Sequence, residues 1–108
     1  MLETSELTAA VDRFADRLRA APQSRLKRGA AAEGLALARE LALRAQRIET
    51  PDEVPRIMPD AGLFAVADQL TVAGRDLAEA LRTAPSGSLR EVDEAVSLVD
   101  AAKRRAGL

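Results

Sequence analysis

The feature that most constrains this chain is an apolar repeat in which hydrophobic residues recur at alternating spacings of four and three. Four separate stretches carry the repeat. The first runs through Leu7, Val11, Phe14, Leu18 and Ala21. The third is the most regular and runs through Leu63, Ala67, Leu70, Gly74, Leu77 and Leu81. This spacing places the side chains on one stripe of an α-helix, which needs other helices to cover it. The sequence therefore predicts an all-α fold.

The chain has 108 residues, enough for one domain with a single buried core. We expect one helical domain over residues 1–108, with helices at about residues 5–21, 24–49, 60–84 and 88–106. Short connections favour helices that are neighbours in the sequence packing in opposite directions. The predicted architecture is an antiparallel up-down-up-down four-helix bundle.

Hydroxyl side chains mark the expected starts of three helices. Thr4 or Ser5 is placed to cap the first helix and Ser24 the second. Ser88, followed three residues later by Glu91, forms a capping box for the last helix. These residues fix where the helices are expected to begin.

Two glycines lie inside predicted helices, Gly34 in the second and Gly74 in the third. An antiparallel hairpin would bring them to the same height. A glycine inside a helix costs about 1 kcal/mol relative to alanine. We therefore expect the two backbones to approach closely at that level; the alternative is that the glycines have no packing role.

The residue types that most often carry chemistry are missing. The sequence has no cysteine and no histidine, which excludes disulfides and removes the commonest general base and zinc ligand. The carboxylate pairs Asp76 with Glu79 and Glu91 with Glu94 project away from the apolar stripes, so they are not expected to line a metal site inside the bundle. We expect no enzyme, no cofactor and no metal.

The charge is nearly balanced, with 16 basic and 17 acidic residues and a net charge of −1. Such a chain has no overall field to attract nucleic acid or an anionic membrane. No apolar run approaches the ~20 residues of a membrane span, and no basic leader opens the chain. We expect a cytoplasmic protein. The abundance of alanine, and of arginine over lysine, is typical of high-GC bacterial genomes.

The second predicted helix carries a second apolar stripe beside its first. In a four-helix bundle each helix touches two neighbours, so a broad apolar face is the simpler interpretation. The alternative is a surface for self-association into a homo-oligomer. Its candidate residues are Leu35, Ala38, Ala42 and Leu43.

The connection at residues 50–60 combines three prolines with the apolar side chains of Val54, Ile57 and Met58. One short turn is expected at its start, at Thr50. The simpler interpretation is a lid that closes the end of the core. The alternative is a loop that docks a protein partner through the three apolar residues.

A run of basic residues crosses the first connection, from Arg17 to Arg28. Cations near the end of the first helix are explained by its partial negative charge. Other cations lie at predicted helix starts, where the dipole disfavours them, and form a candidate anion site. They are Arg25, Lys27, Arg28 and, through the assumed topology, Arg90. Nucleic acid is not favoured as the anion, because the chain is neutral overall and lacks interleaved aromatic residues.

The sequence thus favours a small non-enzymatic helical protein that acts through protein–protein interaction or self-association. The alternative is a regulatory protein that binds an anion or nucleic acid through its basic end. A small-molecule site is the third possibility, but the apolar stripes contain no polar cluster that would give it specificity.

Overall fold

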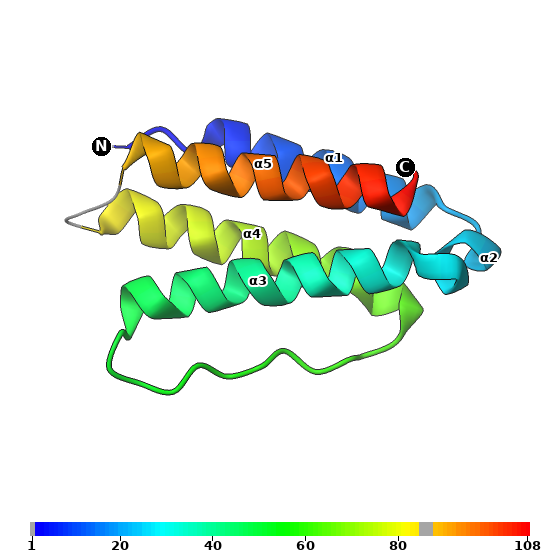
Figure 1. Cartoon of the computed structure of the whole chain (residues 1–108), viewed down its shortest axis with the longest axis horizontal. Coiled ribbons are helices and arrows are strands. Elements are labelled where there is room, and N and C mark those ends of the chain that lie inside the picture. Colours follow the sequence, from blue (N-terminus) through cyan, green and yellow to red (C-terminus); the bar gives the residue numbers. More distant parts are fainter. Residues whose placement is uncertain (1, 85–87) are drawn as a thin grey trace.

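Four long helices lie side by side in the computed structural model, which describes residues 2–84 and 88–108 (Figure 1). They are α1 (Ser5–Ala20), α3 (Ala31–Glu49), α4 (Val66–Thr83) and α5 (Leu89–Ala106). Three short turns complete the described elements: α2 (Gln23–Arg25), the π-helical turn η1 (Leu26–Ala30) and the 3-10 turn η2 (Leu63–Ala65). No strand occurs in either described range. The predicted all-α four-helix architecture is confirmed, although the third long helix begins later than residue 60. The second predicted helix, at residues 24–49, is not continuous, because the backbone is kinked at Gly29 and the long helix begins only at Ala31.

The direction of the helices differs from the predicted up-down-up-down order. α1 and α5 run one way along the bundle, whereas α3 and α4 run the other way, parallel to each other (Figure 1). Near the start of α3, Gly34 lies against Val66, the first residue of α4. Arg19, near the end of α1, binds Asp68 near the start of α4. The order is therefore up-down-down-up, with one long crossover between α3 and α4.

The length and composition of residues 50–62 allow the parallel pair. An extended chain of this length reaches about 40 Å, whereas the 18 residues of α4 span only about 27 Å as a helix. Pro51, Pro55 and Pro59 fix their own backbone and hold the residues before them in extended conformations. The prediction failed because it took this stiff segment for a hairpin loop instead of a crossover that returns along the bundle.

The four long helices form a square in which two pairs of chain neighbours, α1 with α3 and α4 with α5, lie on the diagonals. α4 packs against α3 and α1, and α5 packs against the same two helices from the other side. α1 touches α3 only slightly, and so does α4 with α5. Each helix therefore covers two others along its length, which requires the broad apolar faces seen in the sequence.

The core is made of the predicted stripes and is rich in alanine. In α1, Leu7, Val11, Phe14 and Leu18 are all buried, as expected. Phe14 is the largest fully buried side chain.

None of the helices in residues 2–84 and 88–108 is both long enough and apolar enough to cross a membrane.

Both helix glycines mark close approaches, but not to each other. A Cβ atom at Gly74 would lie 2.7 Å from Cγ1 of Val11 in α1. At Gly34 it would lie 2.7 Å from Cγ1 of Val66 and 3.0 Å from Cδ1 of Leu18. The expectation that the two glycines face each other is wrong, because α3 and α4 run parallel and the glycines sit at different heights.

The predicted caps are confirmed only for α5, where the Ser88 hydroxyl accepts a hydrogen bond from the backbone N–H of Glu91 at 3.3 Å. Ser24 is not a cap, since α2 begins one residue earlier and follows Pro22. The start of α1 is also different.

At the start of α1, Thr4 occupies the cap position but makes no side-chain cap. Its buried hydroxyl instead accepts a hydrogen bond from Nη1 of Arg82 at 2.8 Å, which joins α1 to the end of α4. The carboxylate of Glu3 accepts the backbone N–H of Ser5 at 2.8 Å, and this hydrogen bond lowers the pKa of Glu3.

Candidate functional site

The segment at residues 50–62, hereafter the crossover, is held in place by side chains of α3 and α4. The amide of Gln46 pairs with the backbone of Arg56 twice, since Nε2 donates to the carbonyl at 3.0 Å and Oε1 accepts from the N–H at 2.8 Å. Nε of Arg39 donates to the carbonyl of Met58 at 2.8 Å. These contacts replace the backbone partners that an extended segment lacks outside a sheet.

A further contact comes from α4, where Nε2 of Gln69 donates to the carbonyl of Pro59 at 2.9 Å. The crossover is thus fixed to both helices of the parallel pair. Sequence reasoning missed Gln46, Arg39 and Gln69. The prolines are the one signal that could have pointed to them, because a stiff extended segment needs external hydrogen-bond partners.

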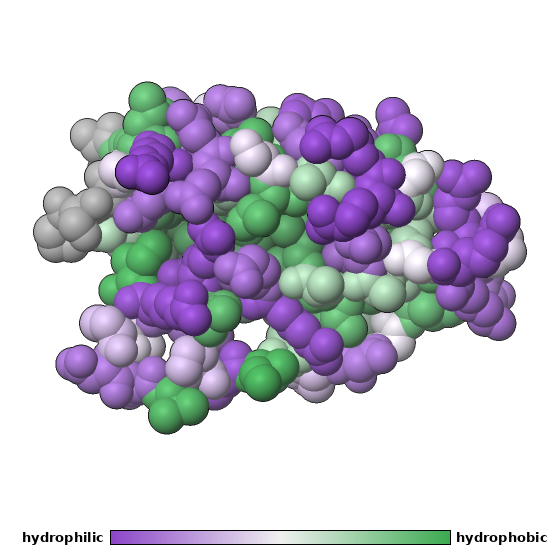
Figure 2. All heavy atoms as spheres, in the orientation of Figure 1, coloured by the Kyte–Doolittle hydropathy of each residue, from purple (hydrophilic) through white to green (hydrophobic). Residues whose placement is uncertain are grey.

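A cavity of about 790 Å³ lies between the crossover and α3. Figure 2 shows the opening, with the crossover along the lower edge of the molecule and the helices above it. Ala42 and Ala45 of α3 line it with small apolar side chains. Its charged lining consists of Glu49, Glu53, Asp76 and Arg56. The cavity therefore combines apolar surface with an excess of carboxylates.

The three predicted docking residues differ in exposure: two are exposed and one packs against the core. Val54 is 90% exposed and Ile57 is 81% exposed, and both line the cavity. The interpretation of these two residues as a lid is therefore wrong, because the stiff crossover carries them outside the core. Met58 alone packs partly against the core. The short turn is present, with the N–H of Glu53 bonded to the carbonyl of Thr50 at 3.0 Å.

Removing the amide of Gln46 should loosen the crossover. Gln46→Ala removes both hydrogen bonds to the backbone of Arg56, each contributing about 0.5–1.5 kcal/mol. We expect trypsin to cut after Arg56 about tenfold faster, because cleavage follows the population of the opened segment. Mass spectrometry of the fragments over time gives the rate. In Gln23→Ala, which removes an exposed glutamine of α2, the rate should stay unchanged; equal acceleration in both variants would contradict the role of Gln46.

The predicted self-association residues do not form an outer surface. Leu35 is 8% exposed and Ala38 is fully buried within the chain. Ala42 lines the crossover cavity, and Leu43 is half-buried. The hypothesis of a self-contact through all four residues is wrong, because the second stripe of α3 is used inside the bundle.

The predicted anion site is also divided. Arg25, Lys27 and Arg28 are exposed at the end of the bundle where α1 and α5 finish. Arg90 lies in the first turn of α5, at the opposite end of a molecule 43 Å long. The placement of Arg90 is wrong because the up-down-down-up order moves the last connection to the other end. In its place the fold brings Arg105, from the last turn of α5, which sequence reasoning missed.

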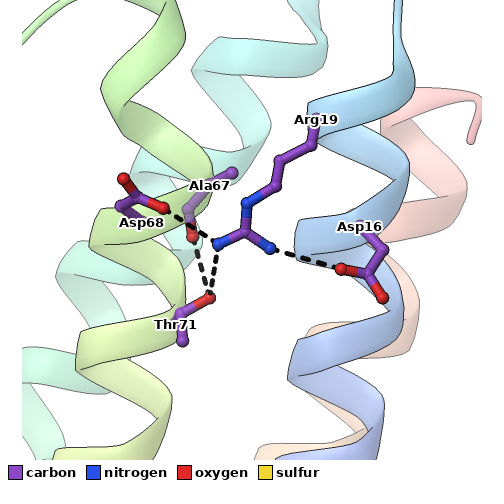
Figure 3. Close-up of polar contacts among 5 residues, drawn as sticks. All are labelled: Asp16, Arg19, Ala67, Asp68 and Thr71. Atoms are coloured by element: carbon purple, nitrogen blue, oxygen red, sulfur yellow. Dashed lines mark hydrogen bonds and ion pairs between the residues drawn. The ribbon is translucent and has the colours of Figure 1, made fainter.

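Arg19, a member of the same basic run, is already occupied. Its guanidinium bridges α1 and α4, with Nη2 donating to Asp68 at 2.9 Å and Nη1 to Asp16 at 3.2 Å (Figure 3). Nη2 also reaches Thr71, whose hydroxyl donates to the carbonyl of Ala67 at 3.0 Å (Figure 3). The hydrogen bond with Asp68 raises the pKa of Arg19. Its role is to tie two helices together.

The carboxylates weighed as metal ligands do not converge. Asp76 lines the crossover cavity, while Glu79 binds Arg82. Glu94 approaches Arg44 at 3.8 Å, in a second cavity that Glu91 also lines. Within the described ranges, no group of three or more carboxylates is placed to hold a metal ion.

The chain was also compared with protein-family models, with curated proteins and with solved structures, and none of the three comparisons finds a match.

Proposed function

We propose that this protein is a non-enzymatic binding protein whose crossover face takes up an apolar, positively charged segment of a protein partner. The observation that carries the proposal is the exposure of Val54 and Ile57, at 90% and 81%, beside a cavity of about 790 Å³. Single exposed apolar residues need no explanation. Two that share the lining of one cavity offer a partner adjacent apolar contacts.

The hydrogen bonds of the crossover support this use. Gln46 and Arg39 fix the backbone on both sides of Ile57, through Arg56 and Met58. The apolar side chain is therefore displayed from a backbone that is already ordered. Less conformational entropy is lost when a partner binds to such a surface.

The charge around the cavity selects the partner's chemistry. Among the lining residues are three carboxylates, those of Glu49, Glu53 and Asp76, and one guanidinium, that of Arg56. A partner segment that presents lysine or arginine beside its apolar side chains complements this lining, whereas an acidic segment is repelled. One face of a basic amphipathic helix meets both requirements.

The rest of the proposal concerns the kind of activity, the origin of the protein and its location in the cell. The sequence offers no histidine or cysteine for catalysis, so binding is the activity we assign to it. We also propose a bacterial, cytoplasmic protein. The arginine-rich and alanine-rich composition supports this origin.

The proposal can be tested with a synthetic amphipathic peptide built from leucine and lysine at helical spacing. We expect saturable shifts of the backbone amide signals of residues 42–58 when the ¹⁵N-labelled protein is titrated with it. The double variant Val54→Ser with Ile57→Ser should bind about tenfold more weakly, a loss of about 1.4 kcal/mol. The same peptide with glutamate in place of lysine should not bind.

The matched control is Leu89→Ser. Leu89 is 62% exposed, but it begins α5, which supplies no lining residue to the crossover cavity. Its substitution should leave binding unchanged. Equal binding of the acidic and basic peptides, or binding that the double variant does not weaken, would overturn the proposal. Dimerisation of the free protein that is lost in the double variant would also overturn it, because a second copy would then be the occupant.

A further inference from the structure

A small cavity at the end of the bundle where α1 and α5 finish is lined by arginines. It has a volume of about 220 Å³ and lies between η1 and the last turn of α5. Its lining residues are Arg25, Arg28, Gly29, Ala30, Arg105 and Ala106. Three of these six residues carry a guanidinium and none carries a carboxylate. Hydrophilic side chains gather at the end of the bundle formed by α2 and η1 (Figure 2).

Two of the arginines are held in position by other groups. Nη1 of Arg25 donates to the carbonyl of Gly107 at 2.7 Å. Nε of Arg105 donates to the carboxylate of Glu33 at 2.9 Å. Each guanidinium has five N–H donors, so both keep donors for a ligand while their orientation is fixed.

The third arginine has its guanidinium available. Among residues 2–84 and 88–108, no side-chain hydrogen bond or ion pair involves Arg28. Gly29, next to it, has a φ of 147°, a conformation that favours glycine and that kinks the chain inside η1, just before α3. A Cβ atom at Gly29 would meet nothing within 4 Å, so the backbone turn, and not crowding, requires the glycine.

The dipole of α5 does not account for this arrangement. It favours Arg105, which lies in the last turn of α5. It does not act on Arg28, which lies in η1. Arg25, Arg28 and Arg105 place three positive charges around one cavity, and an anion bound there would offset their mutual repulsion.

We infer that this cavity binds a phosphate group, as inorganic phosphate or as a small phosphate monoester. Guanidinium groups bind phosphate oxygens through paired hydrogen bonds. The volume of about 220 Å³ is below the roughly 300–1,000 Å³ of sites that enclose whole small molecules, which fits a single anionic group. The site is separate from the crossover face and does not depend on its function.

The test is a titration of the ¹⁵N-labelled full chain with inorganic phosphate, with the ionic strength held constant by chloride. We expect saturable shifts of the backbone amides of residues 25–30 and 105–107. Arg28→Gln should weaken binding about tenfold, and Arg28→Lys about threefold, because lysine keeps the charge but loses the fork. Circular dichroism should show both variants folded, since Arg28 has no side-chain hydrogen bond or ion pair to lose in the described ranges.

Arg90→Gln is the matched control, because Arg90 is an exposed arginine at the opposite end of the bundle. It should leave phosphate binding unchanged. Glycerol phosphate, titrated in parallel, distinguishes the ligand sources: tighter binding than inorganic phosphate assigns the site to a monoester, and weaker binding assigns it to the free ion.

Absence of saturable shifts, or equal binding by Arg28→Gln and the unsubstituted protein, would overturn the inference. A single-stranded oligonucleotide that binds while inorganic phosphate does not would also overturn it, because the basic end would then be an extended nucleic-acid surface. Such binding would weaken steeply with added salt.

Discussion

Replacement of Phe14 by alanine is expected to lower the free energy of unfolding by about 3–5 kcal/mol. Phe14 is fully buried in α1 and is the largest side chain in the core. Its loss removes apolar contacts and leaves a cavity that the surrounding helices fill only in part. Small domains have only about 5–15 kcal/mol of stability in total, so the variant should lose a large share of its stability.

Urea denaturation followed by circular dichroism at 222 nm measures this loss, since the chain has no tryptophan or tyrosine for fluorescence. The control is the second phenylalanine. Phe64 is 75% exposed in η2, and Phe64→Ala should change stability by less than about 0.5 kcal/mol. Phe14→Leu, which keeps most of the volume, should cost only about 1.5 kcal/mol and remain folded. Similar losses at both phenylalanines would contradict the assigned packing.

Gly74→Ala is expected to destabilise the protein although alanine is the better helix former. The added methyl group would lie 2.7, 2.8 and 3.1 Å from three atoms of Val11. Val11 is fully buried and β-branched, so it has little freedom to move aside. Overpacking of this kind costs about 1–3 kcal/mol, against a gain of about 1 kcal/mol from helix propensity. The difference is a net loss of up to about 2 kcal/mol.

A double-mutant cycle with Val11→Ala separates the two effects. When Val11 is truncated, the methyl group at residue 74 has room, and the same Gly74→Ala change should stabilise the protein by about 0.5–1 kcal/mol. The sign of the effect therefore reverses with the residue opposite. Urea denaturation of the four proteins gives the coupling energy. A Gly74→Ala effect of the same sign in both backgrounds would show that α1 and α4 do not meet at this glycine.

The apolar repeat predicted most of the core because helical periodicity is a local property of the chain. Leu7 and Phe14 in α1, and Leu70 and Leu77 in α4, are buried as expected. The direction of α4 is not local. It depends on whether residues 50–62 form a hairpin loop, which makes α3 and α4 antiparallel, or a crossover, which makes them parallel. The spacing of the prolines is compatible with both. The hydrogen bonds of Gln46, which hold the crossover, are visible only in the structure.

The candidate sites were predictable only where one segment supplies the residues. Val54 and Ile57 belong to the same crossover and were identified, although their exposure was not expected. The basic cavity joins Arg25 and Arg28 to Arg105, which lies far along the chain. Because the assumed topology placed Arg90 at that end instead, the sequence predicted only two of the three arginines of this site.

The diagonal placement of α1 with α3 and of α4 with α5 affects how the protein reaches its native state. In an up-down-up-down bundle, consecutive helices pack as hairpins, which form early because their segments are close along the chain. Here α1 gains its main packing partners only from α4 and α5, since it touches α3 only slightly. Native contacts are thus weighted toward pairs distant along the chain, which slows folding relative to simple bundles of the same size. During synthesis, the apolar faces of α1 and α3 therefore stay largely uncovered until α4 and α5 have been made.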